Sequence, residues 1–163
     1  METLRPIPTP VFNGSVETGL RLLVLLEAFY PEKLDLEAPA LLDYFVVHTA
    51  DLGGPDSLHP ALPERVGEYR VRRTLIQEAL RMLLRVSLIE VVEAADGISF
   101  LSGDDTPAFV RLLNSDYNRD LSDRASWLAR RVHGDGAAAF ASMRQLIDRW
   151  SLEFQTEVGL PNG

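Results

Sequence analysis

Apolar residues recur at helical spacing through most of the chain, and one pair of strand-like runs interrupts this pattern. Residues 15–30 form the first helical segment, in which most positions are apolar, so a largely buried helix is predicted. Ser15 can cap the start of this helix, and Pro31 ends it. Residues 1–14 contain three prolines and no periodicity, and they predict an extended N-terminal arm.

A second helix is predicted to follow Asp35, a residue type that caps helices. Pro39 is compatible with a helix only near the first turn, so the helix begins close to this residue. Its apolar face continues to Thr49, and two glycines and a proline at 53–55 end it. Residues 56–67 are irregular, and a loop of this length in a small domain is more often functional than accidental.

A third helix is predicted over residues 68–86, and its two faces differ in character. One face is apolar and comprises Val71, Leu75, Ala79, Met82, Leu83 and Val86. The opposite face is a polar stripe that comprises Arg70, Arg73, Gln77 and Arg81. The polar stripe can contact phosphates or base edges in a DNA groove, or it can simply face solvent.

Two β-rich runs, residues 88–93 and 98–101, flank a turn at 96–97 and predict a β-hairpin. Three helices followed by a hairpin is the order of elements in a winged-helix domain. The sequence therefore predicts a mainly α fold with a winged-helix-like core, residues 15–102. A DNA-binding hairpin usually carries Lys or Arg, whereas the tip of this one is acidic, which weakens the case for DNA.

Residues 103–163 are predicted to form a C-terminal helical extension. A short helix opens at Thr106, a longer one opens at Ser115, and a last one begins at Ala137. The last helix carries an apolar stripe that comprises Phe140, Met143, Ile147, Trp150 and Phe154. The first three of these are expected to pack on the core, whereas Trp150 and Phe154 are candidate partner-binding residues.

The composition narrows the chemistry that is available. The 163 residues, 46% of them hydrophobic, are enough to bury a core. The absence of cysteine excludes disulfides, thiol nucleophiles and cysteine-ligated zinc. A net charge of −8 opposes a general attraction to nucleic acid. The longest apolar run, residues 22–26, is far too short to span a membrane, and no signal-peptide pattern is present, so a cytoplasmic protein is expected.

No glycine-rich phosphate loop and no Ser-His-Asp arrangement is readable, so no cofactor and no catalytic residue is predicted. His48, Asp51 and His59 are the one candidate metal set, and the alternative that we favour is that His48 and Asp51 hydrogen-bond the loop backbone. Glu68 and Arg72 are four residues apart in the favourable order for a helix ion pair. Arg72 projects toward the apolar side, which predicts a buried or half-buried pair that locks the loop onto the third helix.

The stretch HTADLGGPDSLHP at 48–60, with PERVGE at 63–68 and VRRTLI at 71–76, resembles the type-2 middle component of bacterial ABC-three-component systems. Residues 19–26 and 41–44 are also similar, and the resemblance extends roughly over residues 16–154. The motif positions that we take as candidate partner-binding or structural residues are His48, Asp51, Gly53, Gly54, Pro55, Ser57, Leu58, His59, Pro60, Arg65, Gly67, Glu68 and Arg72.

The resemblance implies a non-enzymatic small subunit. Such systems, which include the Lamassu-type group, pair a coiled-coil ATPase of the SMC type with an effector, often a nuclease, in defence against phages or plasmids. The middle component bridges these partners, and DNA contact within the complex is an open question. The leading hypothesis is therefore a non-catalytic adaptor. A winged-helix transcriptional regulator that uses the polar stripe is the alternative, and a metal-dependent hydrolase is the least favoured reading.

Overall fold

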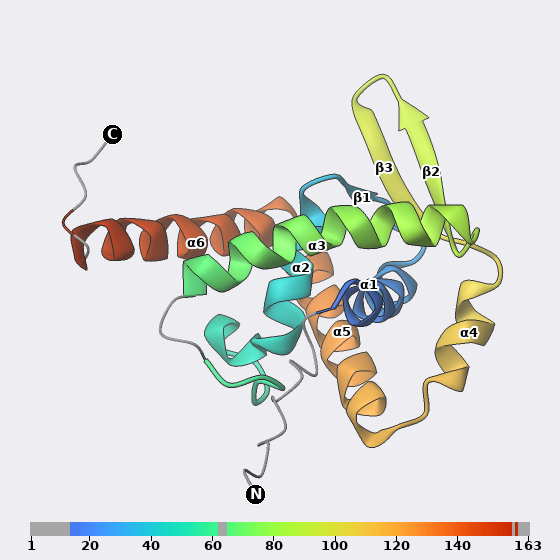
Figure 1. The fold of residues 1–163 in the computed structure, drawn as a ribbon, viewed down its shortest axis with the longest axis horizontal. Coiled ribbons are helices and arrows are strands. Elements are labelled where there is room, and N and C mark those ends of the chain that lie inside the picture. Colours follow the sequence, from blue (N-terminus) through green and yellow to red (C-terminus); the bar gives the residue numbers. More distant parts are fainter. Residues whose placement is uncertain (1–13, 62–64, 158, 160–163) are drawn as a thin grey trace, which may run out of the picture.

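A computed structural model describes residues 14–61, 65–157 and 159. In this part of the chain the elements are, in order, α1 (Ser15–Phe29), β1 (Leu34–Asp35), α2 (Ala38–Val47), a 3₁₀ helix η1 (Thr49–Leu52), α3 (Arg65–Arg85), β2 (Ile89–Ala94), β3 (Gly97–Ser102), α4 (Thr106–Leu112), α5 (Asp116–Asp135) and α6 (Ala137–Glu157) (Figure 1). The fold is mainly α with one β-hairpin, as the sequence predicts. The predicted N-terminal arm lies outside the described residues, except for Gly14.

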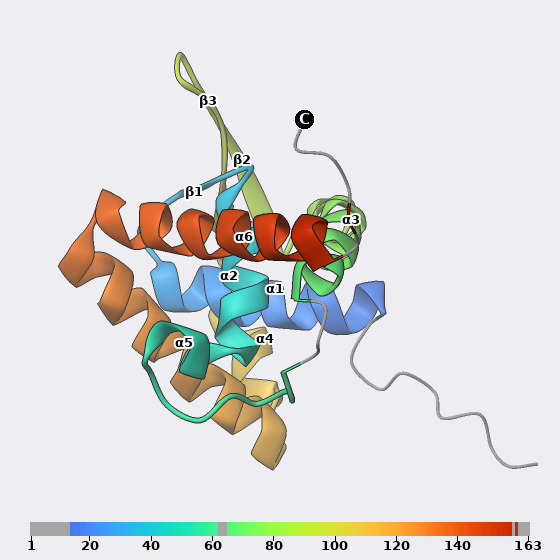
Figure 2. The same cartoon turned by 90° about the vertical axis from the view of Figure 1, so that its left-hand side faces the viewer.

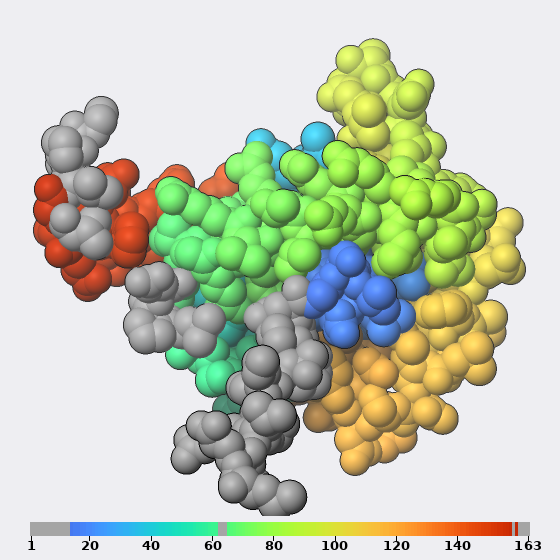
Figure 3. All heavy atoms as spheres, in the orientation of Figure 1, coloured from blue at the N-terminus to red at the C-terminus, as the bar shows by residue number. Residues whose placement is uncertain are grey.

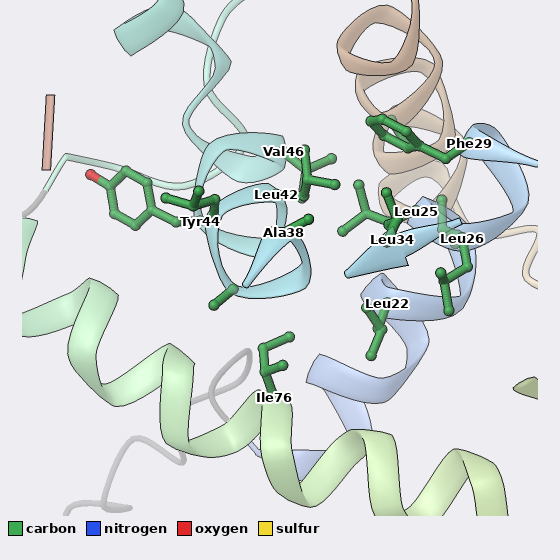
Figure 4. Packing of buried hydrophobic residues seen from close by; sticks show 14 of the residues in the cluster. Leu22, Leu25, Leu26, Phe29, Leu34, Ala38, Leu42, Tyr44, Val46 and Ile76 are labelled. Carbon is green, nitrogen blue, oxygen red and sulfur yellow. The ribbon is translucent and has the colours of Figure 1, made fainter. Parts of the chain in front are cut away.

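The centre of the fold is formed by α1 and α2, which are apolar on nearly all sides. Residues 22–26 of α1 are all buried, and so is every residue of α2. A helix with this pattern must be covered on several faces, and α3, α5 and α6 pack around the pair. Figure 4 shows side chains from α1, α2, β1 and α3 meeting in this core.

The hairpin is confirmed, and it belongs to a three-stranded antiparallel sheet in the order β1-β3-β2. The strands β2 and β3 pair from Ile89↔Ser102 to Ala94↔Gly97. The sequence analysis did not predict β1, because a two-residue strand is too short to produce an alternating pattern. Beyond β1 the hairpin projects away from the helices (Figures 1 and 2). The predicted order of three helices and a hairpin is therefore present, and the winged-helix assignment itself stays a prediction.

The buried face of α3 differs from the predicted one. Val71 and Val86 were placed on the apolar face, yet each is 58% exposed. The residues of α3 that are buried are Val66, Arg72, Ile76, Ala79, Leu80 and Leu83. The helix is turned so that the long Arg72 side chain points inward, where it meets a carboxylate of α2. Apolar periodicity alone could not predict which side of α3 is buried, because Arg72, at the centre of the buried side, is charged.

The residues that cap the helices agree only partly with those predicted from the sequence. Gly14, and not Ser15, is the N-cap of α1. The Asp35 carboxylate accepts hydrogen bonds from the backbone N–H groups of Glu37 and Ala38 at the start of α2, so it stabilises this end from outside the cap position. Ser115 caps α5 as predicted, accepting from the N–H of Asn118.

The helices α5 and α6 share the core of α1 and α2. Leu121, Leu128 and Met143 are each at most 1% exposed and belong to the same hydrophobic cluster as α1 and α2. Within the described residues, no helix is both long enough and apolar enough to cross a membrane. The proposed boundary at residue 103 between a core domain and an extension stays a prediction.

Replacing Met143 with alanine tests whether α6 folds together with the core. The side chain is fully buried, so we expect the free energy of unfolding to fall by about 2–5 kcal/mol, in one cooperative transition measured by urea denaturation. Leu152→Ala on the same helix removes a side chain that is 58% exposed and should change this free energy by less than about 0.5 kcal/mol. A separate early transition in the Met143 variant would indicate an independent C-terminal unit.

Candidate functional site

Four charged side chains meet in the interior where α1, α2 and α3 come together. The Asp43 carboxylate lies between two guanidinium groups: Oδ1 is 2.8 Å from Arg21 Nε, and Oδ2 is 2.9 Å from Arg72 Nη1. Arg72 also contacts Glu68, with 3.0 Å between Nη2 and Oε1. Two positive and two negative charges therefore offset one another in the core, and we call this set the ionic core. The predicted Glu68–Arg72 pair is confirmed, with Arg72 buried and Glu68 half-buried.

Two histidines extend the ionic core, and their partners determine their tautomers. His48 Nε2 lies 2.9 Å from Glu68 Oε1, and because a carboxylate only accepts, Nε2 carries the proton. Arg72 can only donate, so His59 Nδ1, at 3.2 Å from Arg72 Nη2, is the acceptor. A neutral His59 then carries its proton on Nε2, which lies 2.9 Å from the Tyr117 hydroxyl on α5.

The electrostatics of the ionic core keep it in this protonation state. Burial lowers the pKa of His59 to about 4, and the positive charges of Arg72 and Arg21 act in the same direction. Burial by itself would raise the pKa of Glu68, but the hydrogen bond from His48 and the charge of Arg72 outweigh it and hold the pKa below its ordinary value. At neutral pH, Glu68 is therefore ionised and His59 is neutral.

The loop at 53–60, which carries much of the motif, is a built structure. Gly53 has a φ of 72°, a left-handed conformation that favours glycine where η1 ends. Gly54 lies against the indole of Trp127 on α5, where a Cβ atom would come within 2.4 Å of the ring. The Thr49 hydroxyl donates to the Pro55 carbonyl at 2.8 Å, and the Ser57 hydroxyl accepts from the Ala50 N–H at 3.2 Å.

Two arginines of α5 hold this loop and the end of η1 from the other side. Arg124 Nε donates to the Asp56 carbonyl at 3.0 Å, and Arg131 Nη1 donates to the Leu52 carbonyl at 3.0 Å. The Arg131 guanidinium also lies over the Trp127 ring, 5.8 Å from its centroid. The loop therefore joins the ionic core, through His59, to the outer surface of α5.

The three residues of the proposed metal set point to different partners. His48 bonds to Glu68, Asp51 contacts the Tyr44 hydroxyl at 3.3 Å and Arg65 at 3.4 Å, and His59 bonds to Arg72 and Tyr117. Over the described ranges, no group of three or more His, Asp or Glu residues is placed to hold a metal ion. The favoured alternative, that His48 and Asp51 hydrogen-bond the loop backbone, is not observed among the described residues, where both side chains bond to other side chains.

The remaining motif residues differ in their exposure and contacts. Leu58 is half-buried and packs on the hydrophobic core, whereas Pro60 and Gly67 are exposed. The Arg65 guanidinium lies over the Trp150 ring, 5.1 Å from its centroid. The candidate partner-binding residue Trp150 thus has contacts within its own chain.

Both candidate partner-binding residues of α6 are half-buried. The Trp150 ring lies 5.8 Å from that of Tyr44 and 6.2 Å from that of Phe45, centroid to centroid. Phe154 lies one turn further along α6. By contrast, the four residues of the polar stripe, Arg70, Arg73, Gln77 and Arg81, are all exposed on α3.

Three members of this arrangement were not predicted from the sequence: Arg21, Asp43 and Tyr117. A signal for the first two was present, because each is a lone charge inside an otherwise apolar helical run, LRLLVLL in one case and ALLDYFVV in the other. Two lone charges of opposite sign in two buried helices favour a pair. Tyr117 had no such signal, because its contact with His59 spans 58 residues.

Replacing Asp43 with alanine leaves two buried guanidinium groups without their shared carboxylate. We expect the free energy of unfolding, measured by urea denaturation at pH 7, to fall by about 3–5 kcal/mol. Asp135→Ala removes an ion pair whose members are about half exposed, and the loss should be about 0.5 kcal/mol or less. If Asp43→Ala does not fold, the neutral isostere Asp43→Asn gives a measurable intermediate loss of unfolding free energy. Equal losses for the Asp43 and Asp135 variants would contradict a stabilising role of the buried carboxylate.

The pKa of His59 predicts that the protein loses stability in mild acid. An unfolded chain protonates this imidazole near pH 6.5, whereas the folded protein resists until about pH 4, so stability is full above pH 6.5 and falls as the pH drops through this interval. We expect about 1–2 kcal/mol of the unfolding free energy to disappear between pH 7 and pH 5.

The matched variants are His59→Asn, which retains an acceptor for Arg72, and His133→Asn, whose histidine is 72% exposed. Urea denaturation at several pH values should give a shallower pH dependence for the His59 variant and an unchanged one for the His133 variant. If the unfolding free energy depends on pH identically in the unmodified protein and in both variants, His59 is not the titrating group.

Comparison with known proteins gives one finding. The family model described as "ABC-three component (ABC-3C) system Middle Component 2" matches residues 11–153, a span that includes the ionic core, the loop and all of the described elements except the end of α6. No curated protein and no solved structure matches the chain.

Proposed function

Because the chain belongs to the Middle Component 2 family of ABC-three component systems, we propose that it is a non-catalytic adaptor that bridges an SMC-type ATPase and an effector, a nuclease, in a defence complex. The family match over residues 11–153 carries this proposal, since it makes the chain one component of a system with several subunits. The bridging role, the nature of both partners and the target, phages or plasmids, are the parts that we propose.

The state of the polar groups in the interior supports a non-catalytic role. An acid or base in an enzyme needs access to a substrate. Here Asp43, Glu68 and Arg72 are at most 10% exposed and contact one another. The neutral His59 is engaged on both ring nitrogens, by Arg72 and by Tyr117. These groups hold the helices and the loop together. We therefore expect the protein to act through its surface.

The outer surface supports binding to partners of defined charge. The polar stripe of α3 is basic, whereas β2 and the hairpin turn carry Glu90, Glu93 and Asp96. Electrostatic complementarity of this kind selects partners and speeds association more than it adds affinity. A bridging subunit needs at least two distinct surfaces, and this chain has them on adjoining elements.

The second candidate function is DNA binding through the polar stripe, as in a winged-helix regulator. Exposed guanidinium groups along α3 favour it, because they can reach phosphates or base edges. The acidic hairpin beside α3 opposes it, because its carboxylates repel the phosphate backbone. We therefore place DNA contact second, as a function of the chain either alone or within the complex.

Co-expression tests the adaptor proposal. The tagged chain is produced together with the proteins encoded beside it and analysed by size-exclusion chromatography. We expect it to co-elute with an SMC-type ATPase and an effector, and Phe154→Ala to weaken this assembly while the exposed Leu152→Ala does not. A chain that stays unbound beside every encoded neighbour contradicts the proposal, and ATP hydrolysis or DNA cleavage by the purified chain alone contradicts its non-catalytic part.

A mobility-shift assay tests the second candidate. DNA binding predicts a shift by the isolated chain at low salt, an affinity that falls steeply as salt rises, and loss of the shift in Arg73→Ala. Arg130→Ala, an exposed arginine on α5, is the matched control. No shift at low salt excludes independent DNA binding.

A further inference from the structure

The strand β2 is an open edge of the three-stranded sheet. The strand order is β1-β3-β2, so β3 covers one side of β2, and no strand of the described chain lies on the other. Among the described residues, β2 has no backbone hydrogen bond to any element other than β3. Figure 3 shows the hairpin standing clear of the body. A further strand therefore has access to this edge.

The strand register determines which backbone groups of β2 are available at this edge. Ala94↔Gly97 closes a two-residue turn, and the closing pair of such a hairpin is hydrogen-bonded. Bonded and non-bonded pairs alternate, so the N–H and C=O groups of Glu93, Val91 and Ile89 point away from β3. Ile89 is buried at the base, whereas Val91 is 39% exposed and Glu93 is exposed. An added strand can therefore bond to the backbone of Val91 and Glu93.

The β2 edge lacks most of the features by which sheets prevent unwanted pairing. Sheet edges are usually blunted by proline, by lysine, by a bulge or by a very short strand. The opposite edge of this sheet, β1, has two residues. By contrast, β2 has six residues without proline or lysine, and it pairs one to one with β3 without a bulge. Its remaining protection is the pair of exposed carboxylates of Glu90 and Glu93.

These two carboxylates determine which strand can be added. Successive side chains of a strand point to opposite faces, so Glu90 lies on one face of the sheet and Glu93 on the other. A strand added in the plane of the sheet has side chains on both faces and therefore meets both carboxylates. Opposite charges across two strands stabilise their pairing, and like charges destabilise it. The β2 edge thus rejects acidic strands and favours basic ones.

A second copy of this chain does not suit the β2 edge. Residues 89–102 contain three carboxylates, Glu90, Glu93 and Asp96, and no Lys or Arg. Pairing β2 with β2 of another copy would join two such hairpins without a basic residue from either, and each copy carries a net charge of −8. Nucleic acid is disfavoured as well, because the carboxylates repel phosphates. A basic polypeptide in an extended conformation is the occupant that the charges select.

We propose that β2 accepts an extended segment of a partner protein as a fourth strand, and that this segment carries two basic residues three positions apart with apolar residues between them. The basic residues lie opposite Glu90 and Glu93, and the apolar residues lie opposite Val91 and Val92. Ile98, which is 49% exposed, lies on the same face as Val91 and adds apolar contact. Main-chain hydrogen bonds provide affinity, and the charges provide selection. The proposal rests on the adaptor proposal for the existence of a partner.

A synthetic peptide tests the charge selection on the full chain. The probe is a dye-labelled peptide with blocked ends and the core sequence Thr-Arg-Val-Val-Arg-Thr, and the control peptide has glutamate in place of both arginines. Fluorescence anisotropy should show that the arginine peptide binds and that the glutamate peptide binds at least about tenfold more weakly. The chain variant Glu90→Arg with Glu93→Arg should reverse this preference. No binding of the arginine peptide at millimolar concentration overturns the proposal.

Backbone variants separate strand addition from simple attraction between charges. Val91→Pro removes an N–H that points outward, and an edge strand tolerates proline at such a position. We expect this variant to bind the arginine peptide at least about tenfold more weakly. Val91→Thr retains the N–H and the β-branched shape, so it is the matched control and should bind within about twofold of the unmodified chain. Circular dichroism and the urea midpoint confirm that each variant is folded, and equal binding by Val91→Pro overturns the proposal.

Co-expression with the neighbouring proteins distinguishes this proposal from the adaptor proposal. We expect Val91→Pro to lose a partner that the unmodified chain and Val91→Thr retain in size-exclusion chromatography. If Val91→Pro co-elutes with every partner as the unmodified chain does, the strand proposal is wrong and the adaptor proposal stands. If the peptide binds as expected but no neighbour co-elutes, the adaptor proposal is wrong, and the preference of the β2 edge for a basic strand stands.

Discussion

The carboxylate of Asp43, held between Arg21 and Arg72, is the interaction on which the rest of this structure depends. Charges are costly to bury, and the core tolerates these because each has an opposite partner within about 3 Å and further hydrogen bonds around it. The pair joins α1, α2 and α3 at one point. Removing one partner leaves an unpaired charge in the interior. Another mutual orientation of the three helices would also separate these charges, so it is disfavoured.

That orientation decides which residues face outward. Because Arg72 points inward to Asp43 and Glu68, the opposite side of α3 is turned to solvent, and the polar stripe lies there. Through His59 the same network reaches the loop and α5. Several residues of the motif, among them His48, His59 and Arg72, thus make contacts within their own chain.

This arrangement supports the proposed role as a non-catalytic adaptor. Its polar interior is occupied by mutual contacts, which favours rigidity. Its exterior includes the polar stripe of α3 and a hairpin with Glu90, Glu93 and Asp96, which favours specific and salt-sensitive association. The proposed adaptor role draws on these surfaces, and it depends on a rigid core that keeps them in a defined relation.

The sequence by itself determined the helices, the hairpin and the Glu68–Arg72 pair, because these follow from local periodicity and from neighbours four residues apart. The pair between Arg21 and Asp43 was not predicted, although each residue is a lone charge in an apolar helical run. Only the tertiary structure decided the rotation of α3, the short strand β1 and the contact between His59 and Tyr117. These depend on residues far apart in the chain, and a linear pattern holds no information about which distant side chains will face each other once the helices pack.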